Sequence, residues 1–119
     1  MLEPFVQEAV VDLADGSEPA ALGAAVTITL CGSVDHEPPC PLAPHFSRTE
    51  LVGGRVRLRV LFVTEPEHEA HVRALIRSAL ERGSVRTPDG SAEWALLEIG
   101  ARPVAENEVG HAARLAVAD

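Results

Sequence analysis

Two cysteines and two histidines lie close together in CGSVDHEPPCPLAPHFS, which spans residues 31–47. Cys31, His36, Cys40 and His45 are separated by four, three and four residues. Thiolate and imidazole are the usual ligands of tetrahedral zinc, and local spacings of about two to five residues are typical of such sites. Mg²⁺ and Ca²⁺ prefer oxygen ligands instead. The spacing therefore predicts a metal site, with zinc as the metal.

Other roles for the two cysteines remain open. Cys31 suits a small buried apolar residue, and Cys40, between prolines, suits a surface thiol. A redox disulfide between them is a third alternative, although it lacks the C-x-x-C spacing of thiol oxidoreductases. If all four ligands bind the metal, its shell is closed, and a closed shell indicates a structural site. The sequence assigns no catalytic residue.

The prolines of this segment restrict its backbone. Proline lacks a backbone N–H, so it is excluded from helix interiors and from central strands. If residues 25–31 and 55–63 are strands, then 23 residues separate them, a length that is uncommon for loops without a function. We therefore expect a long loop pinned by the metal. Its prolines are Pro38, Pro39, Pro41 and Pro44.

The elements that would position this loop follow from hydrophobic periodicity. Helical spacing of apolar residues predicts a helix from Thr64 to about Arg82, ended by Gly83, and a short helix is expected through Leu22. The tail, residues 103–119, is ambiguous between helix and strand, and its alanine spacing slightly favours a helix. Alternating apolar residues predict strands at 5–13, 25–31, 55–63 and 92–99.

This order predicts an α+β fold with a ferredoxin-like βαββαβ succession. We expect a single antiparallel sheet with helices on one face, and the Pro-rich Cys/His loop between strands 2 and 3. A wide hairpin is the alternative for the first two strands, because a parallel crossover usually needs a dozen or more residues. With 119 residues, the chain is expected to form one domain, residues 1–119.

Arginines alternate with apolar residues in the strand at 55–63. Arg55, Arg57 and Arg59 would share one face of that strand. An anion site is one interpretation of this row. A half-solvated face that pairs with acids such as Glu8 or Asp12 is favoured.

The net charge of −8 is unevenly distributed. The first 47 residues contain seven of the 18 acids and none of the ten arginines, so nucleic acid and anionic lipid are not expected as partners. No apolar run reaches the roughly 20 residues that span a bilayer. The N-terminus lacks the basic and apolar regions of a secretory signal, so we expect a soluble cytoplasmic protein. In a reducing compartment, metal ligands explain two cysteines better than a structural disulfide does.

These features favour a small zinc-binding domain that acts as an interaction or self-associating module. A homodimer or a protein partner is the expected assembly. The alternative is a small enzyme or ligand-binding protein with a pocket on the sheet face, which would use the metal or a group such as His68 or Arg57. A non-enzymatic role is favoured because the four ligands would close the metal shell.

Overall fold

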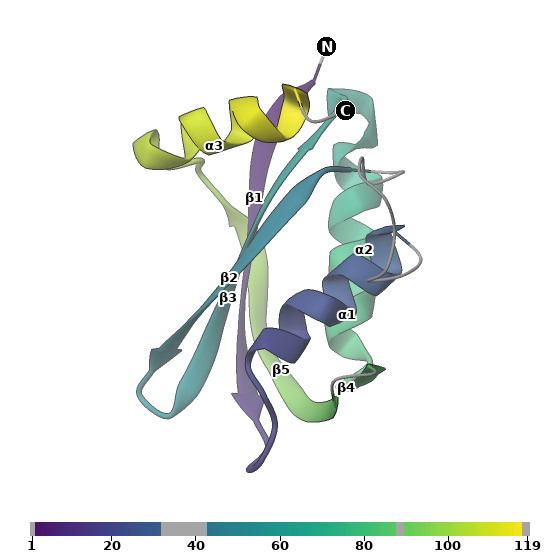
Figure 1. Ribbon diagram of the computed structural model, residues 1–119, viewed down its shortest axis with the longest axis vertical. Helices are drawn as coiled ribbons and strands as arrows, with labels where there is room; N and C mark the ends of the chain where they lie inside the picture. The colour runs from purple at the N-terminus through teal and green to yellow at the C-terminus, as the bar shows by residue number, and fades with distance from the viewer. Residues whose placement is uncertain (1, 32–42, 88–89, 118–119) are drawn as a thin grey trace.

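The computed structural model describes residues 2–31, 43–87 and 90–117. They form one curled antiparallel sheet and three α-helices, with strand order β2-β3-β1-β5-β4 (Figure 1). None of the helices in these ranges is long and apolar enough to cross a membrane. The elements are β1 (Glu3–Leu13), α1 (Ala20–Cys31), β2 (His45–Val52), β3 (Arg55–Thr64), a 3-10 turn (Pro66–His68), α2 (Glu69–Glu81), β4 (Ser84–Thr87), β5 (Gly90–Arg102) and α3 (Glu106–Val117).

The main core lies between one face of the sheet and helices α1 and α2. Trp94 on β5 is buried there, and its indole Nε1 donates a hydrogen bond to the Leu80 carbonyl at 2.8 Å. Arg73 ties α2 to β1 by donating to the Val6 carbonyl at 2.9 Å. The fully buried side chains of this core include Val11, Leu22, Val26, Val56, Leu58, Phe62, Val72, Ile76 and Leu80.

The opposite face of the sheet carries α3 and a smaller apolar cluster. Val6, Leu61, Val63 and Ala112 are buried together there. Leu61 and Val63 alternate along β3 with residues of the main core, so they point to the other side. The expectation that all helices lie on one face is therefore wrong, because α3 has its own apolar stripe and packs on the second face (Figure 1).

Residues 25–31 form the second half of α1, so the predicted strand there is wrong. Val26, Ile28 and Leu30 alternate as in a strand, but Leu22, Val26 and Leu30 also repeat every four residues as in a helix. These last three side chains are buried against the main core. Packing of this stripe has decided the structure over the β-propensity of the branched residues.

Strand β2 was not expected from the sequence, and it shortens the predicted loop. Residues 45–52 pair with β3 along their whole length, and Gly53 and Gly54 close the hairpin with φ of 57° and 81°. Positive φ at both positions is typical of a type I′ turn. The loop predicted between strands 2 and 3 is thus wrong in its bounds, while residues 32–42 lie outside the described residues.

Strand β4 and the start of β5 occupy residues 84–87 and 90–91, ahead of the strand predicted at 92–99. Ser84–Thr87 pairs with Gly90–Glu93 in an antiparallel hairpin. The predicted strand at 92–99 is confirmed and extends to Arg102. The slight preference for a helix in the tail is also confirmed, since α3 covers Glu106–Val117.

Candidate functional site

Two of the four predicted metal ligands lie on described elements. Cys31 is the last residue of α1 and His45 is the first residue of β2. His36 and Cys40 lie outside the described residues. Among the described ranges, no group of three or more His, Cys, Asp and Glu residues could hold a metal ion. The predicted zinc site therefore stays a prediction.

His45 is held at both ring nitrogens. Its Nδ1 lies 3.1 Å from the Ala43 carbonyl oxygen, which can only accept, so Nδ1 carries the proton. Its Nε2 lies 2.9 Å from the Thr27 hydroxyl on α1, which donates to the remaining ring lone pair. Metal-binding histidines commonly donate one ring N–H to a backbone carbonyl and bind through the other nitrogen. The ring of His45 has this tautomer, with the Thr27 hydroxyl in the ligand position.

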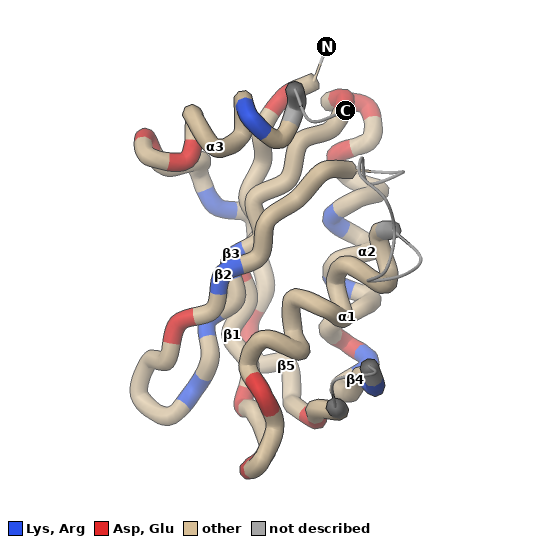
Figure 2. The backbone as a smooth tube through the Cα atoms, in the orientation of Figure 1, with Lys and Arg blue, Asp and Glu red and all other residues tan. Residues whose placement is uncertain are grey.

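Arg59 is the centre of an ion-pair network on the α3 face of the sheet. It donates to Glu108 through Nε at 2.9 Å and through Nη2 at 2.7 Å, and to Glu8 through Nη1 at 3.0 Å. Glu8 also lies 3.8 Å from Arg57 and 3.6 Å from Arg102. Basic positions on β2 and β3 lie side by side at the middle of the sheet (Figure 2). The expected pairing of the arginine row with Glu8 is confirmed.

The carboxylate of Glu108 is strongly stabilised in its charged form. Hydrogen bonds from Arg59 lower the pKa of Glu108 to about 2, and the Ala105 backbone N–H and the charge of Arg48 act in the same direction. Burial opposes this shift. The same contacts raise the pKa of Arg59 above its usual range. Glu108 is therefore a fixed anion that anchors α3, and it is not suited to proton transfer near neutral pH.

A small hollow lies between α3 and strands β2 and β3. Its volume is about 130 Å³, well below the roughly 300–1,000 Å³ of ligand pockets. Phe46 on β2 contacts His111 on α3 there, with ring centroids 4.6 Å apart. The hollow is lined by Phe46, Arg48, Arg59, Leu61, Asn107, Glu108 and His111. This hollow is therefore too small for an ordinary small-molecule ligand.

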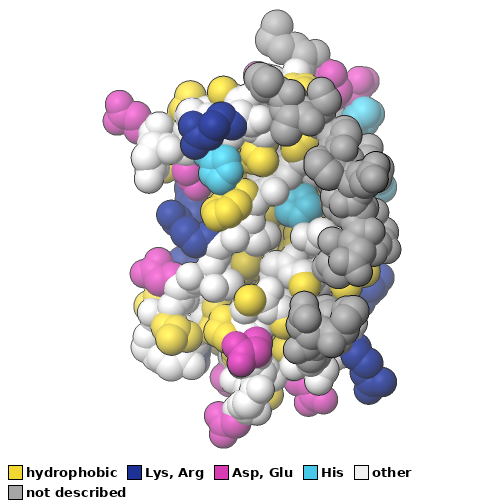
Figure 3. All heavy atoms as spheres, in the orientation of Figure 1, with side chains coloured by type: hydrophobic (Ala, Val, Ile, Leu, Met, Phe, Trp, Pro, Cys, Tyr) yellow, Lys and Arg dark blue, Asp and Glu magenta, His cyan; other side chains and the backbone are white. Residues whose placement is uncertain are grey.

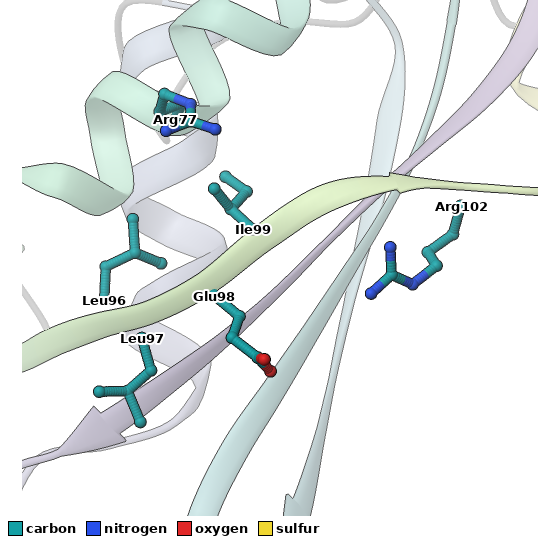
Figure 4. A pocket seen from close by; sticks show the side chains of 6 residues that line it. All are labelled: Arg77, Leu96, Leu97, Glu98, Ile99 and Arg102. Carbon is teal, nitrogen blue, oxygen red and sulfur yellow. The ribbon is translucent and has the colours of Figure 1, made fainter.

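A larger groove of about 540 Å³ runs along the outer edge of β5 (Figure 4). Arg77 on α2 overlooks it from the main-core side, while Glu98 and Arg102 lie on the other side of the strand. The groove is lined by Arg77, Leu96, Leu97, Glu98, Ile99 and Arg102. Leu97 keeps 43% of its side chain exposed. The groove thus combines apolar surface with charges of both signs.

The outer edge of β5 has no neighbouring strand beyond residue 93 within the described ranges, because β4 pairs only with residues 90–93. The Ala14 N–H donates to the Glu93 carbonyl. Backbone groups alternate in direction along a strand, so the even-numbered residues of β1 direct their N–H and C=O groups toward β5. On β5, the residues paired with these positions include Glu98, Gly100 and Arg102, so their backbone groups face β1. Ile99 and Ala101 therefore direct N–H and C=O into the groove, where the Ala101 carbonyl accepts a hydrogen bond from Arg102 Nη1 at 3.0 Å.

The sequence prediction did not single out this groove. The stretch LLEIGAR in residues 96–102 contains an exposed leucine and two oppositely charged residues, but these features are common on surfaces. A shift in register between Val10 and Val11 turns Leu97 outward, and such an irregularity has no sequence signature. His68 and His71, the other histidine pair, are exposed on the surface of the 3-10 turn and α2.

Comparison with known proteins does not assign the chain: no family model, no curated protein and no solved structure matches it.

Proposed function

We propose that the chain is a non-enzymatic interaction module that binds an extended segment of a partner protein along the outer edge of β5. The observation that carries this proposal is the groove, in which backbone donors and acceptors of Ile99 and Ala101 face outward beside apolar side chains. A peptide that adds as a strand gains main-chain hydrogen bonds from such an edge, and its alternate side chains enter the flanking surface.

The charges beside the groove define the partner segment. Arg77 on one side and Arg102 on the other are both more than half exposed, and their ion pairs, with Glu81 at 3.8 Å and Glu8 at 3.6 Å, are long. Exposed pairs of this kind contribute about 0–1 kcal/mol, so they yield readily to a new carboxylate. The preferred segment is therefore extended, with apolar residues facing Leu96 and Ile99 and with an acidic residue within reach of an arginine.

Selection from a phage library of random linear peptides tests this proposal. Peptides are selected on the wild-type chain and counter-selected on Ala101→Pro, which removes the outward N–H at an exposed edge position where proline is tolerated. Ala101→Val is the matched control because it keeps the N–H. We expect enriched peptides to bind wild type and Ala101→Val and to lose at least tenfold in affinity for Ala101→Pro. Failure to enrich any such peptide would overturn the proposal.

We also propose that residues 31–47 hold a structural zinc ion through Cys31, His36, Cys40 and His45. The spacing of these residues and the protonated Nδ1 of His45 support the assignment. Zinc would have to replace the Thr27 hydroxyl at Nε2 of His45. Such an ion would fasten the end of α1 to the start of β2 and would contribute to folding, not to catalysis.

We also propose that the core has a ferredoxin-like fold. In its support, β1, α1, β2, β3, α2 and β5 follow one another in the order βαββαβ, and their strands are arranged as β5-β1-β3-β2. In this classification β4 and α3 are additions to the core: β4 precedes β5 in the sequence, and α3 follows it.

A further inference from the structure

Strand β2 carries three of the large apolar side chains that remain exposed. Leu51 is 74% exposed, Phe46 is 46% exposed and Val52 is 40% exposed. In the view of Figure 3, hydrophobic side chains gather over the β2–β3 hairpin at the lower left of the molecule. β2 is an edge strand, and within the described ranges only β3 pairs with it. An exposed apolar edge of this kind favours pairing with another strand.

Two observations establish which backbone groups of β2 point toward β3 and which point away from it. The Val63 N–H donates to the Pro44 carbonyl at 3.0 Å, and the two-residue turn makes Val52 and Arg55 the closing pair of the hairpin. Because successive residues alternate, the even-numbered residues of β2 bond to β3. Ser47, Thr49 and Leu51 therefore direct N–H and C=O away from the sheet, toward the free edge.

The charges on β2 select one way for this edge to pair with itself. In an antiparallel pair of two copies centred on Arg48, the two Arg48 residues would lie directly opposite each other. In a pair centred on Glu50, the two Glu50 residues would do so. A pair centred on Thr49 brings Arg48 opposite Glu50 of the second copy at both ends, and Phe46 opposite Val52. Like charges directly opposite are destabilising, whereas opposite charges and apolar pairs are favourable.

We infer that two copies of this chain associate through their β2 edges, antiparallel about a two-fold axis at Thr49, to form one continuous sheet. The outward backbone groups of Ser47 and Leu51 then bond across the axis, and those of Thr49 bond to their own equivalents. The symmetry makes the interface self-complementary, because each ion pair and each apolar pair occurs twice. This interface is at the opposite edge of the sheet from the β5 groove, so it does not depend on the function proposed for that groove.

The test is a charge-reversal cycle on the full chain, read by sedimentation equilibrium over a dilution series. Wild type should be a dimer that dissociates on dilution. Arg48→Glu and Glu50→Arg should each be monomeric at concentrations where wild type is dimeric. In each variant, residues 48 and 50 of the two copies carry the same charge and face each other at both ends of the interface. The double variant, Arg48→Glu with Glu50→Arg, should recover the dimer. An equal mixture of the two single variants should form a heterodimer, because one chain then has two arginines and the other two glutamates.

Two controls separate loss of pairing from loss of folding. Arg86→Glu on β4 and Glu98→Arg on β5 make the same charge changes at exposed positions away from β2, and they should leave the dimer intact. Thr49→Pro removes the central outward N–H and should give a folded monomer, whereas Thr49→Val should remain dimeric. Cooperative thermal unfolding of every variant confirms that the chain is folded.

The inference is overturned if wild type is monomeric throughout the series, or if the mixed single variants do not associate. It is also overturned if Glu98→Arg dissociates the dimer while Glu50→Arg does not, since that result assigns the interface to β5. Peptide binding to the β5 groove by monomeric Arg48→Glu is a separate readout, so either proposal can fail while the other holds.

Discussion

Arg59 on β3 and Glu108 on α3 are joined by two parallel hydrogen bonds of 2.9 Å and 2.7 Å across 49 residues of sequence. The guanidinium group also donates to the Pro103 carbonyl at 2.9 Å. Paired donors and acceptors of this geometry are the strongest ion pairs in proteins. They fix the start of α3 on the sheet face that carries the arginine row.

We predict that Glu108→Gln lowers the free energy of unfolding at pH 7 by about 2–3 kcal/mol, because Arg59 loses the closer of its two charged partners in a largely buried position. Glu106→Gln is the matched control in the same helical turn and is exposed, so it should cost less than about 0.5 kcal/mol. Chemical denaturation of both variants measures the difference. Equal losses in the two variants would show that the ion pair contributes nothing to stability.

The same ion pair predicts a pH dependence. Because the folded pKa of Glu108, about 2, lies below its ordinary value of 4.5, its contribution is fully present above about pH 4.5 and is lost as the pH falls through 2. This contribution is on the order of 3 kcal/mol. The unfolding free energies of wild type and Glu108→Gln should therefore converge between pH 4.5 and 2. Parallel curves across this range would contradict the assignment.

Gly83 provides a second test of the fold. Its φ is 72°, and a Cβ at this position would lie 2.9 Å from the Trp94 carbonyl oxygen, whereas Gly16, with φ of 83°, has open space around it. Gly16→Ala should cost about 1 kcal/mol for the left-handed backbone alone. Gly83→Ala should cost about 2–4 kcal/mol, because a backbone atom must also move. Urea midpoints compare the two variants, and equal midpoints would mean that the β4–β5 region adapts freely.

Zinc binding through His45 gives a fourth prediction. Wild type purified without an affinity tag should hold about one zinc per chain, as in a closed structural site, and His45→Ala should lose it. His71→Ala is the matched control because this histidine is exposed on α2. Thr27→Val should bind zinc at least as tightly as wild type, because Nε2 of His45 no longer has to give up a hydroxyl donor. Elemental analysis and calorimetric titration measure these effects, and equal zinc content in the two histidine variants would exclude His45 as a ligand.

Trp94 gives a fifth prediction, which concerns the main core. Trp94→Phe removes the 2.8 Å hydrogen bond to the Leu80 carbonyl and leaves a space in the packed interior. The expected loss is about 2–4 kcal/mol, from one hydrogen bond and from reduced packing. Trp94→Phe should remain cooperative in thermal unfolding, with a lower midpoint. An unchanged midpoint would mean that neither this hydrogen bond nor the packing of the indole contributes to stability.

The sequence predicted the elements in which periodicity and end signals agreed. The strands around residues 5–13 and 55–63 alternate regularly, and the helix before Gly83 has both an apolar stripe and a C-terminal glycine. Residues 25–31 were misassigned because Val26, Ile28 and Leu30 fit both periods. Which period wins depends on the packing of the rest of the chain, and local sequence does not contain that information.

Strand β2 was not predicted for a different reason. Its side chains alternate between Phe46, Arg48 and Glu50 on one face and Ser47 and Thr49 on the other, so neither face is consistently apolar. An edge strand half covered by α1 and half exposed has no simple hydrophobic pattern. The candidate zinc ligands follow from residue type, spacing and the Pro-rich segment that contains them, and within the described residues only the hydrogen bonds of His45 add to this support.

The second apolar cluster has a consequence for motion. Within the described ranges few groups hold α3 on the sheet: the buried Ala112, the Glu108–Arg59 ion pair and the ring contact of His111 with Phe46. Segments with so few buried contacts open at a lower free energy than the whole molecule unfolds. The amide hydrogens of α3 should then exchange with solvent well before those of β1 and β3. Each such opening would break the ion pair between Arg59 and Glu108 and would expose Leu61 and Val63, so a covered sheet face would become a transient apolar surface.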